Sequence, residues 1–100
     1  MQSGAVPRLG GLDDVLAAGE IPGGTMRNLA AVHGHLDIGD GVSEDDLVVL
    51  ADAQTSGGLL IALPPGRADE VVAELTSSGH IAAVVGELME GTPGELRVTR

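Results

Sequence analysis

The chain has 100 residues, a formal net charge of −10, and no lysine, cysteine or aromatic residue. One hundred residues allow one domain at most, such acidity disfavours nucleic acid and anionic membranes as partners, and the lack of cysteine excludes disulfides and a thiol nucleophile. No apolar run approaches the roughly 18 residues of a membrane span, and residues 1–4 do not resemble a signal peptide, so we expect a cytoplasmic protein.

A core without aromatic side chains is expected to be weak. Each aromatic side chain would bury roughly 150–250 Å², and the 16 glycines add conformational entropy to the unfolded chain. We therefore expect the chain to be a piece of a larger unit that depends on a partner surface.

The first half of the chain predicts short helices joined by loops. Residues 1–10 are expected to form an irregular lead-in. A short helix over residues 11–19 has acids in its first turn, where they favour the dipole, and stops at a glycine. Thr25 can cap a second helix over residues 26–33, whose apolar residues share one face.

Two features of this second helix invite a ligand interpretation. An anion could rest on free backbone amides at the helix start, with Arg27 supplying charge. Alternatively, Thr25 is only a cap and Arg27 an ordinary ion-pair partner. His33 and His35 would share a face only in extended chain and have no neighbouring third ligand apart from Asp37. We therefore expect ordinary surface or hinge histidines rather than a metal site.

A polar loop over residues 37–42 is expected to lead into a third helix over residues 44–51. Ser43 and the acid three residues later form a capping box, and the helix dipole explains the acids of the first turn. Asp52 stands at the other end, where an acid opposes the dipole and needs a partner. We expect an Asx-turn to the amides that follow, with a metal- or phosphate-linked role as the alternative.

The second half predicts a small sheet with one helix. The expected elements are an apolar strand over residues 59–63, an amphipathic helix over 67–78, an apolar strand over 81–88 and an edge strand over 95–99. In this β-α-β-β order, a right-handed crossover joins the first two strands in parallel, and the last two form a hairpin. The fold class is thus α/β (α+β), with helices packed on the sheet and short helices before it.

The loop before the first strand is polar and contains paired glycines. Thr55 and Ser56 supply hydroxyls, while Gly57 and Gly58 lack a Cβ and allow another group to approach the backbone closely. A tight turn into a buried strand explains the pattern, and so does the wall of a polar-ligand site.

Two blocks resemble the selenide, water dikinases (selenophosphate synthetases). Residues 52–60 are similar to the family's C-terminal Asp-x-Gln-Thr-Ser-Gly-Gly-Leu-Leu motif, and residues 22–28 resemble its Pro-Gly-Gly-Thr-x-Arg-Asn block. The blocks occur in the family's order, and residues 84–88 are a weaker third match. Ala53 stands where the family usually has proline, which changes the stiffness of the loop more than its chemistry. The resemblance runs from about Val6 to the end.

The resemblance implies that residues 1–100 form a single, truncated, aminoimidazole ribonucleotide synthetase-like C-terminal domain of a two-domain, usually homodimeric enzyme. The family's reaction uses ATP, selenide and water, with Mg²⁺, and yields selenophosphate, AMP and orthophosphate. The family's N-terminal ATP-binding domain carries the reactive Cys or selenocysteine, a catalytic lysine and most metal-binding aspartates. This chain has neither Cys nor Lys. We therefore expect it to be inactive alone, to hold no cofactor of its own and to need the missing domain as partner.

In that setting the chain completes the fold and walls the active site of the full enzyme. It could be a truncated gene product, a partial reading frame or one part of a split protein. A non-catalytic interaction or regulatory module is the alternative, and a stand-alone nucleotide-binding protein is disfavoured by the absence of a phosphate-loop motif. We assign no catalytic or metal-ligating residue, and we expect Gly58→Val to damage the enzyme through backbone clash. The residues expected to line the interdomain site are Gly23, Gly24, Thr25, Arg27, Asn28, Thr55, Ser56, Gly57 and Gly58.

Overall fold

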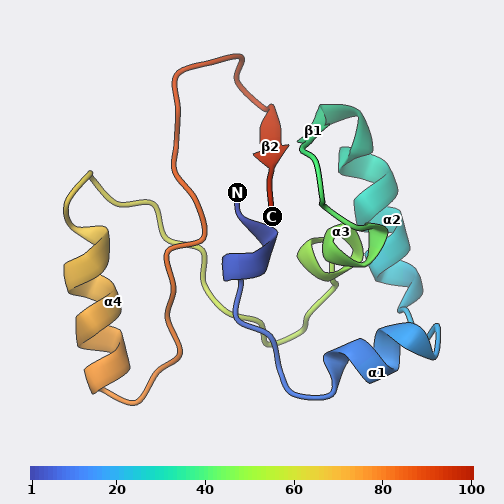
Figure 1. Ribbon diagram of the computed structural model, residues 1–100, viewed down its shortest axis with the longest axis horizontal. Coiled ribbons are helices and arrows are strands. Elements are labelled where there is room, and N and C mark those ends of the chain that lie inside the picture. Colours follow the sequence, from blue (N-terminus) through green and yellow to red (C-terminus); the bar gives the residue numbers. More distant parts are fainter.

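The computed structural model describes residues 1–100 and has a mixed α/β architecture, which confirms the expected class (Figure 1). Three helices gather beside a small parallel sheet, whereas the fourth stands apart at the opposite side of the molecule. None of the helices is long and apolar enough to cross a membrane. The elements are η1 (Ser3–Ala5), α1 (Leu12–Ala17), α2 (Gly23–Val32), η2 (His33–His35), β1 (Leu36–Ile38), α3 (Glu44–Leu50), α4 (Ala68–Ser77) and β2 (Leu96–Val98).

The sheet joins segments from both ends of the chain. Strands β1 and β2 are parallel, with Leu36 opposite Leu96 and Ile38 opposite Val98. Gln2 forms a further parallel bridge with Thr99. The sheet therefore closes the fold by bringing the N-terminus, the middle and the C-terminus of the chain side by side.

A small apolar core lies between α2, α3 and β2. It consists of four buried side chains, and six partly buried ones, among them Leu16 of α1 and Leu36 of β1, pack against it. The predicted capping box of α3 is confirmed, because the Ser43 hydroxyl accepts from the Asp46 amide while the Asp46 carboxylate accepts from the Ser43 amide. This cap fixes the start of the helix that supplies half of the core. The buried apolar residues are Leu29, Leu47, Val48 and Val98.

The predicted β-α-β-β sheet is wrong for this chain. Residues 59–63 and 81–88 are extended but belong to no strand, and Leu59 and Leu88 are 89% and 88% exposed. No residue between 53 and 97 is buried. These two apolar segments lack a partner: their only backbone–backbone hydrogen bond is the one that the Val85 carbonyl accepts. The edge strand near residues 95–99 is present as β2, but it pairs with β1 instead of forming a hairpin.

The predicted helices form, with shifted ends. Helices α1, α3 and α4 lie within the expected ranges, whereas α2 begins at Gly23, three residues before the expected start. Thr25 is therefore inside the helix and buried rather than its cap. The expected polar loop over residues 37–42 is also wrong at its start, because residues 36–38 form β1 by pairing with the distant β2.

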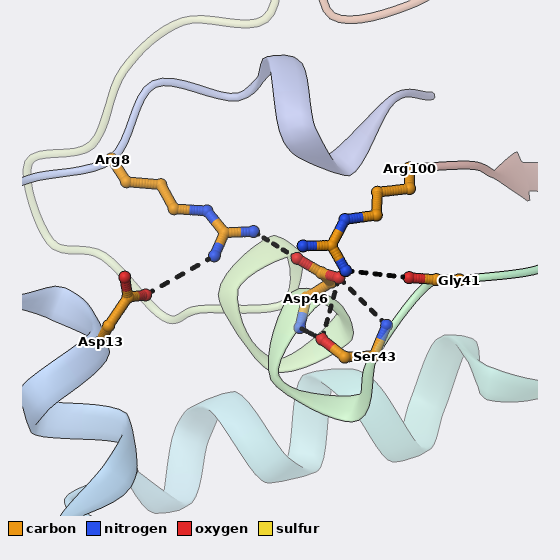
Figure 2. A network of polar contacts seen from close by, with 6 residues as sticks. All are labelled: Arg8, Asp13, Gly41, Ser43, Asp46 and Arg100. Carbon is orange, nitrogen blue, oxygen red and sulfur yellow. Dashed lines mark hydrogen bonds and ion pairs between the residues drawn. The ribbon is translucent and has the colours of Figure 1, made fainter.

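Charged groups fasten the N-terminal segment to α3 and the C-terminus to the loop just ahead of α3 (Figure 2). The Arg8 guanidinium lies 2.5 Å from the Asp46 carboxylate and 3.9 Å from that of Asp13. Arg100 donates to the Gly41 carbonyl at 3.2 Å. The hydrogen bond from the Ser43 amide and then the Arg8 guanidinium lower the pKa of Asp46 from 3.8 to about 2. Asp46 therefore remains ionised in the folded protein at pH values where it is protonated in the unfolded chain.

This depressed pKa predicts an acid-sensitive contribution to stability. Because the folded-state pKa lies below the unfolded value, the contribution is complete above about pH 5 and is mostly lost by about pH 2. We expect Asp46→Asn to flatten the pH dependence of the free energy of unfolding by about 1 kcal/mol over this window, after allowance for solvent screening. Urea titrations of both proteins between pH 2 and 6 measure it, and superimposable pH profiles would contradict it.

Candidate functional site

The two glycine-containing blocks meet where α3 ends and α2 begins. The Thr25 hydroxyl donates to the Asp52 carboxylate at 2.7 Å and accepts from the Ala53 amide at 3.2 Å. Thr25 is completely buried, so these bonds are shielded from competing water. We name this contact between Thr25 and residues 52–53 the block joint.

Two neighbours of Thr25 tighten the block joint. The Asn28 side-chain amide donates to the Ala51 carbonyl at 3.1 Å, which satisfies a carbonyl at the C-terminal end of α3. A Cβ on Gly24 would lie only 3.0 Å from the Ala53 Cβ. A side chain at position 24 would press against Ala53, and glycine lets the first turn of α2 pass residue 53 this closely.

The partner of Asp52 differs from the expected one. An Asx-turn to the following amides was predicted, but the carboxylate accepts from Thr25, 27 residues earlier in the chain. The need for a partner at the C-terminal end of a helix is thus confirmed, while its identity is corrected. Sequence reasoning did not include Asp52 among the site residues, although its position at the C-terminal end of a helix had already indicated that it needs a partner.

The start of α2 presents donors and a positive charge on one side. The amides of Thr25 and Met26 bond to the Pro22 carbonyl, which leaves those of Gly23 and Gly24 without a partner in the helix. Pro22 offers no side-chain cap. The exposed Arg27 side chain folds back over these glycines, within 3.5 Å and 3.8 Å of the positions that a Cβ would occupy. Such a group of donors suits an anion such as a phosphate.

The loop over residues 55–58 leads away from the block joint. All four residues are exposed, and no hydrogen bond connects them with residues 23–28. Gly57 is crowded, because a Cβ there would lie 2.7 Å from the Gln54 side-chain oxygen, whereas Gly58 has no atom within 4 Å. The clash expected for Gly58→Val is therefore not present within this chain, and Gly57 is the position that cannot accept a side chain without displacing Gln54.

An open groove of about 500 Å³ runs beside the block joint. Its lining is mostly apolar, and Asn28 and Asp52 add polar groups from the two blocks. No three His, Cys, Asp or Glu side chains lie close enough together to hold a metal ion. His33 and His35 belong to the short helix η2 and are exposed. The chain therefore offers hydrogen-bonding groups and, at the start of α2, donors that suit an anion. None of its groups of side chains could hold a metal ion.

Comparison with known proteins confirms the resemblance that the two blocks indicate. The chain is 42% identical over 93 residues to the selenide, water dikinase of Salmonella typhimurium. The matched region covers 93% of the chain and 26% of that relative. It is 36% identical over 98 residues to the enzyme of Nitratidesulfovibrio vulgaris, and the matched region covers 98% of the chain and 28% of that relative. It is 39% identical over 89 residues to the enzyme of Myxococcus xanthus, and the matched region covers 89% of the chain and 25% of that relative. The chain thus spans about a quarter of the length of these relatives. No family model matches it, and no solved structure does.

The block joint predicts a specific sensitivity at Thr25. Thr25→Val keeps the shape of the side chain but leaves the Asp52 carboxylate and the Ala53 amide without their partner. We expect a loss of about 1–3 kcal/mol in the free energy of unfolding, measured by urea denaturation. Thr55→Val is the matched control, because Thr55 is exposed and makes no such bond. Equal stability of the two variants would refute the block joint.

The close approach at Gly24 predicts a compensated pair of substitutions. Gly24→Ala forces its new methyl group against Ala53, and we expect it to destabilise the protein by about 1–3 kcal/mol. Ala53→Gly removes the opposing methyl group, so the double variant should recover most of that loss. Additive effects in this double-mutant cycle, measured by thermal or urea unfolding, would show that the two residues do not touch.

Proposed function

We propose that the chain serves as one part of a selenophosphate synthetase. The premise is that nearly the whole chain is related in sequence to about a quarter of a selenide, water dikinase. The complete enzyme is an ATP-dependent phosphotransferase that converts selenide, ATP and water into selenophosphate, AMP and phosphate. The identity of 36–42% over about nine-tenths of the chain carries this proposal.

The chain's role in that enzyme is to complete the fold and to wall the active site. It contains no cysteine and no lysine, so the nucleophile and the catalytic lysine that the resemblance implies come from the rest of the enzyme. None of its residues is assigned a chemical step. The block joint supports the walling role, because it holds both motif blocks in one fixed corner.

The start of α2 is the part of this wall that faces a phosphate. Arg27 and the amides of Gly23 and Gly24 form a group of donors on one side of the helix start. Thr25 and Asn28 act behind them by holding the corner in place. Residues 55–58 extend the wall from the block joint, and their exposed hydroxyls and backbone are available to the partner domain or its ligand.

The residues of this chain do not fit a magnesium site. Mg²⁺ prefers octahedral oxygen coordination that includes carboxylates, and no three acidic or histidine side chains converge here. We therefore assign the Mg²⁺ of the complete enzyme to its other part, together with most of the contacts to ATP.

The partners are the missing N-terminal ATP-binding domain and, in the complete enzyme, a second identical subunit. The absence of any buried residue between positions 53 and 97 supports a missing partner surface. The same observation also favours the second candidate function, a non-catalytic interaction module that retains only the scaffold. The two candidates differ in whether the chain can replace its counterpart in an active enzyme.

A chimeric enzyme tests the proposal. Residues 1–100 replace the matching quarter of the Salmonella typhimurium enzyme, and selenide-dependent formation of AMP from ATP is measured. We expect the chimera to keep activity within about tenfold, because the matched residues are 42% identical, and the chain alone to have none. A folded chimera without activity would favour the interaction module.

Within the chimera, Arg27→Ala is expected to lower kcat/KM for ATP by at least about tenfold. A hydrogen bond to a charged group is worth about 1.5–3 kcal/mol, and tenfold corresponds to about 1.4 kcal/mol. Arg67→Ala is the matched control, since Arg67 is also exposed but lies just ahead of α4 and pairs with Glu70 of that helix. Equal effects of the two substitutions would remove Arg27 from the proposed site.

A further inference from the structure

The first three residues pair with β2 through the isolated bridge of Gln2 and Thr99, just before and at the start of η1. The Met1 amine donates to the Arg97 carbonyl at 2.6 Å, the Thr99 amide donates to the Met1 carbonyl at 2.8 Å, and the Ser3 amide donates to the Thr99 carbonyl at 2.8 Å. This alternation is that of a parallel β-ladder. Residues 1–3 therefore run parallel to β2, on the edge that β1 does not occupy.

Residues 85–86 contact the other edge of this N-terminal segment. The Gln2 amide donates to the Val85 carbonyl at 2.8 Å. A Cβ on Gly86 would lie 3.0 Å from the Met1 Cα, so only glycine permits this approach without displacement. Figure 1 shows the N-terminus between β2 and the extended segment that leads from α4 to β2 and runs opposite to β2.

The path that continues this N-terminal segment ahead of Met1 has hydrogen-bonding groups on both sides. The Val98 carbonyl accepts from Gly39 beside β1, whereas the Arg97 and Thr99 carbonyls accept from residues 1 and 3. By this alternation the Arg97 amide points to the position directly ahead of Met1. Opposite it, residues 87–89 make no backbone hydrogen bond, and Leu88 is 88% exposed.

We propose that an extended segment joined to the chain ahead of Met1 in the longer enzyme forms a β-strand between β2 and residues 86–90. It runs parallel to β2 and antiparallel to residues 86–90, and its side chains alternate between an apolar and a polar face. Met1 and Leu96 line the apolar groove beside the block joint, so the same strand would cover one end of that groove. The inserted strand would make residues 86–90 part of one sheet with β1 and β2.

Covalent continuity favours this occupant over a second copy of the chain. Residues 1–3 already have the direction and register of the inserted strand, whereas two copies would bring together net charges of −10. The inference rests on the proposed function in one respect only, namely that the chain belongs to a longer polypeptide. The relatives, which are about four times as long as the chain, support this. The inference needs no part of the chemistry.

An engineered disulfide tests the register, because the chain contains no cysteine. With Met1 opposite Gly86, the second residue ahead of Met1 lies opposite Leu88, and directly opposed residues of antiparallel strands have the Cα separation that a disulfide needs. A five-residue extension Val-Thr-Val-Cys-Thr is placed ahead of Met1 in Leu88→Cys and in the matched control Leu59→Cys, where Leu59 is 89% exposed. Disulfide formation in a glutathione buffer is followed by peptide mapping.

We expect the disulfide to form at least about tenfold more in Leu88→Cys than in Leu59→Cys. Equal formation in both variants would overturn the proposal. A second measurement uses chains without cysteine, in which the extension is Val-Thr-Val-Thr-Val or an equally long Gly-Ser sequence. The Arg97 amide should exchange with solvent at least about tenfold more slowly with the former, and equal exchange rates would also overturn the proposal. Neither readout involves ATP or selenide, so an inactive chimera and a missing strand are distinguishable failures.

Discussion

The uneven distribution of buried side chains is the constraint on which the rest of the structure depends. All seven buried residues lie in residues 1–48 or at Val98, and the stretch from 53 to 97 contributes none. Helices α2 and α3 and strand β2 therefore hold the molecule together. The two apolar segments that flank α4 in the sequence, residues 59–63 and 81–88, expose most of their large side chains to solvent. Apolar side chains that are exposed in sequence-adjacent groups mark interaction surfaces in folded proteins, and relatives about four times the chain's length have the polypeptide to cover them.

The block joint connects this core to the proposed function. Leu29 and Thr25 belong to the same helix, so the residues that anchor α2 in the core also position its glycine-containing start. Leu47 and Val48 do the same for α3, which ends at residues 51–53. The start of α2 and the end of α3 are thus held by both hydrogen bonds and core contacts, even though the second half of the chain lacks a core. This corner can present Arg27 and the amides of Gly23 and Gly24 to a ligand bound by another domain.

The sequence predicted those features that local chemistry determines. The capping box at Ser43 and the apolar stripe of α4 gave their helices nearly correct ends. The strands at 59–63 and 81–88 were not predicted correctly, because an apolar run becomes a strand only when another segment pairs with it. Strand β1 and the partner of Asp52 were missed for the related reason that both depend on residues 27–60 positions away.

For the candidate site, sequence reasoning found both blocks that form the corner but not the bond that joins them. The motif resemblance was confirmed by the relatives, while the lining roles of the nine residues remain a proposal. The structure separates this set into a buried joint at Thr25, a donor group at Gly23, Gly24 and Arg27, and an exposed loop over residues 55–58. A residue list from sequence alone could not make that separation, because burial and contact are properties of the folded chain.

Amide hydrogen exchange of the isolated chain tests most directly that one small core supports the whole molecule. Amides in the interior of α2, in α3 and at Val98 should exchange at least about a hundredfold more slowly than in an unfolded chain. Those of residues 59–63 and 81–84, which lack backbone partners, should exchange within about tenfold of the unfolded rate. Strong protection of residues 59–63 in a monomeric sample would contradict it, because it would show that the second half of the chain has a partner or a core within itself.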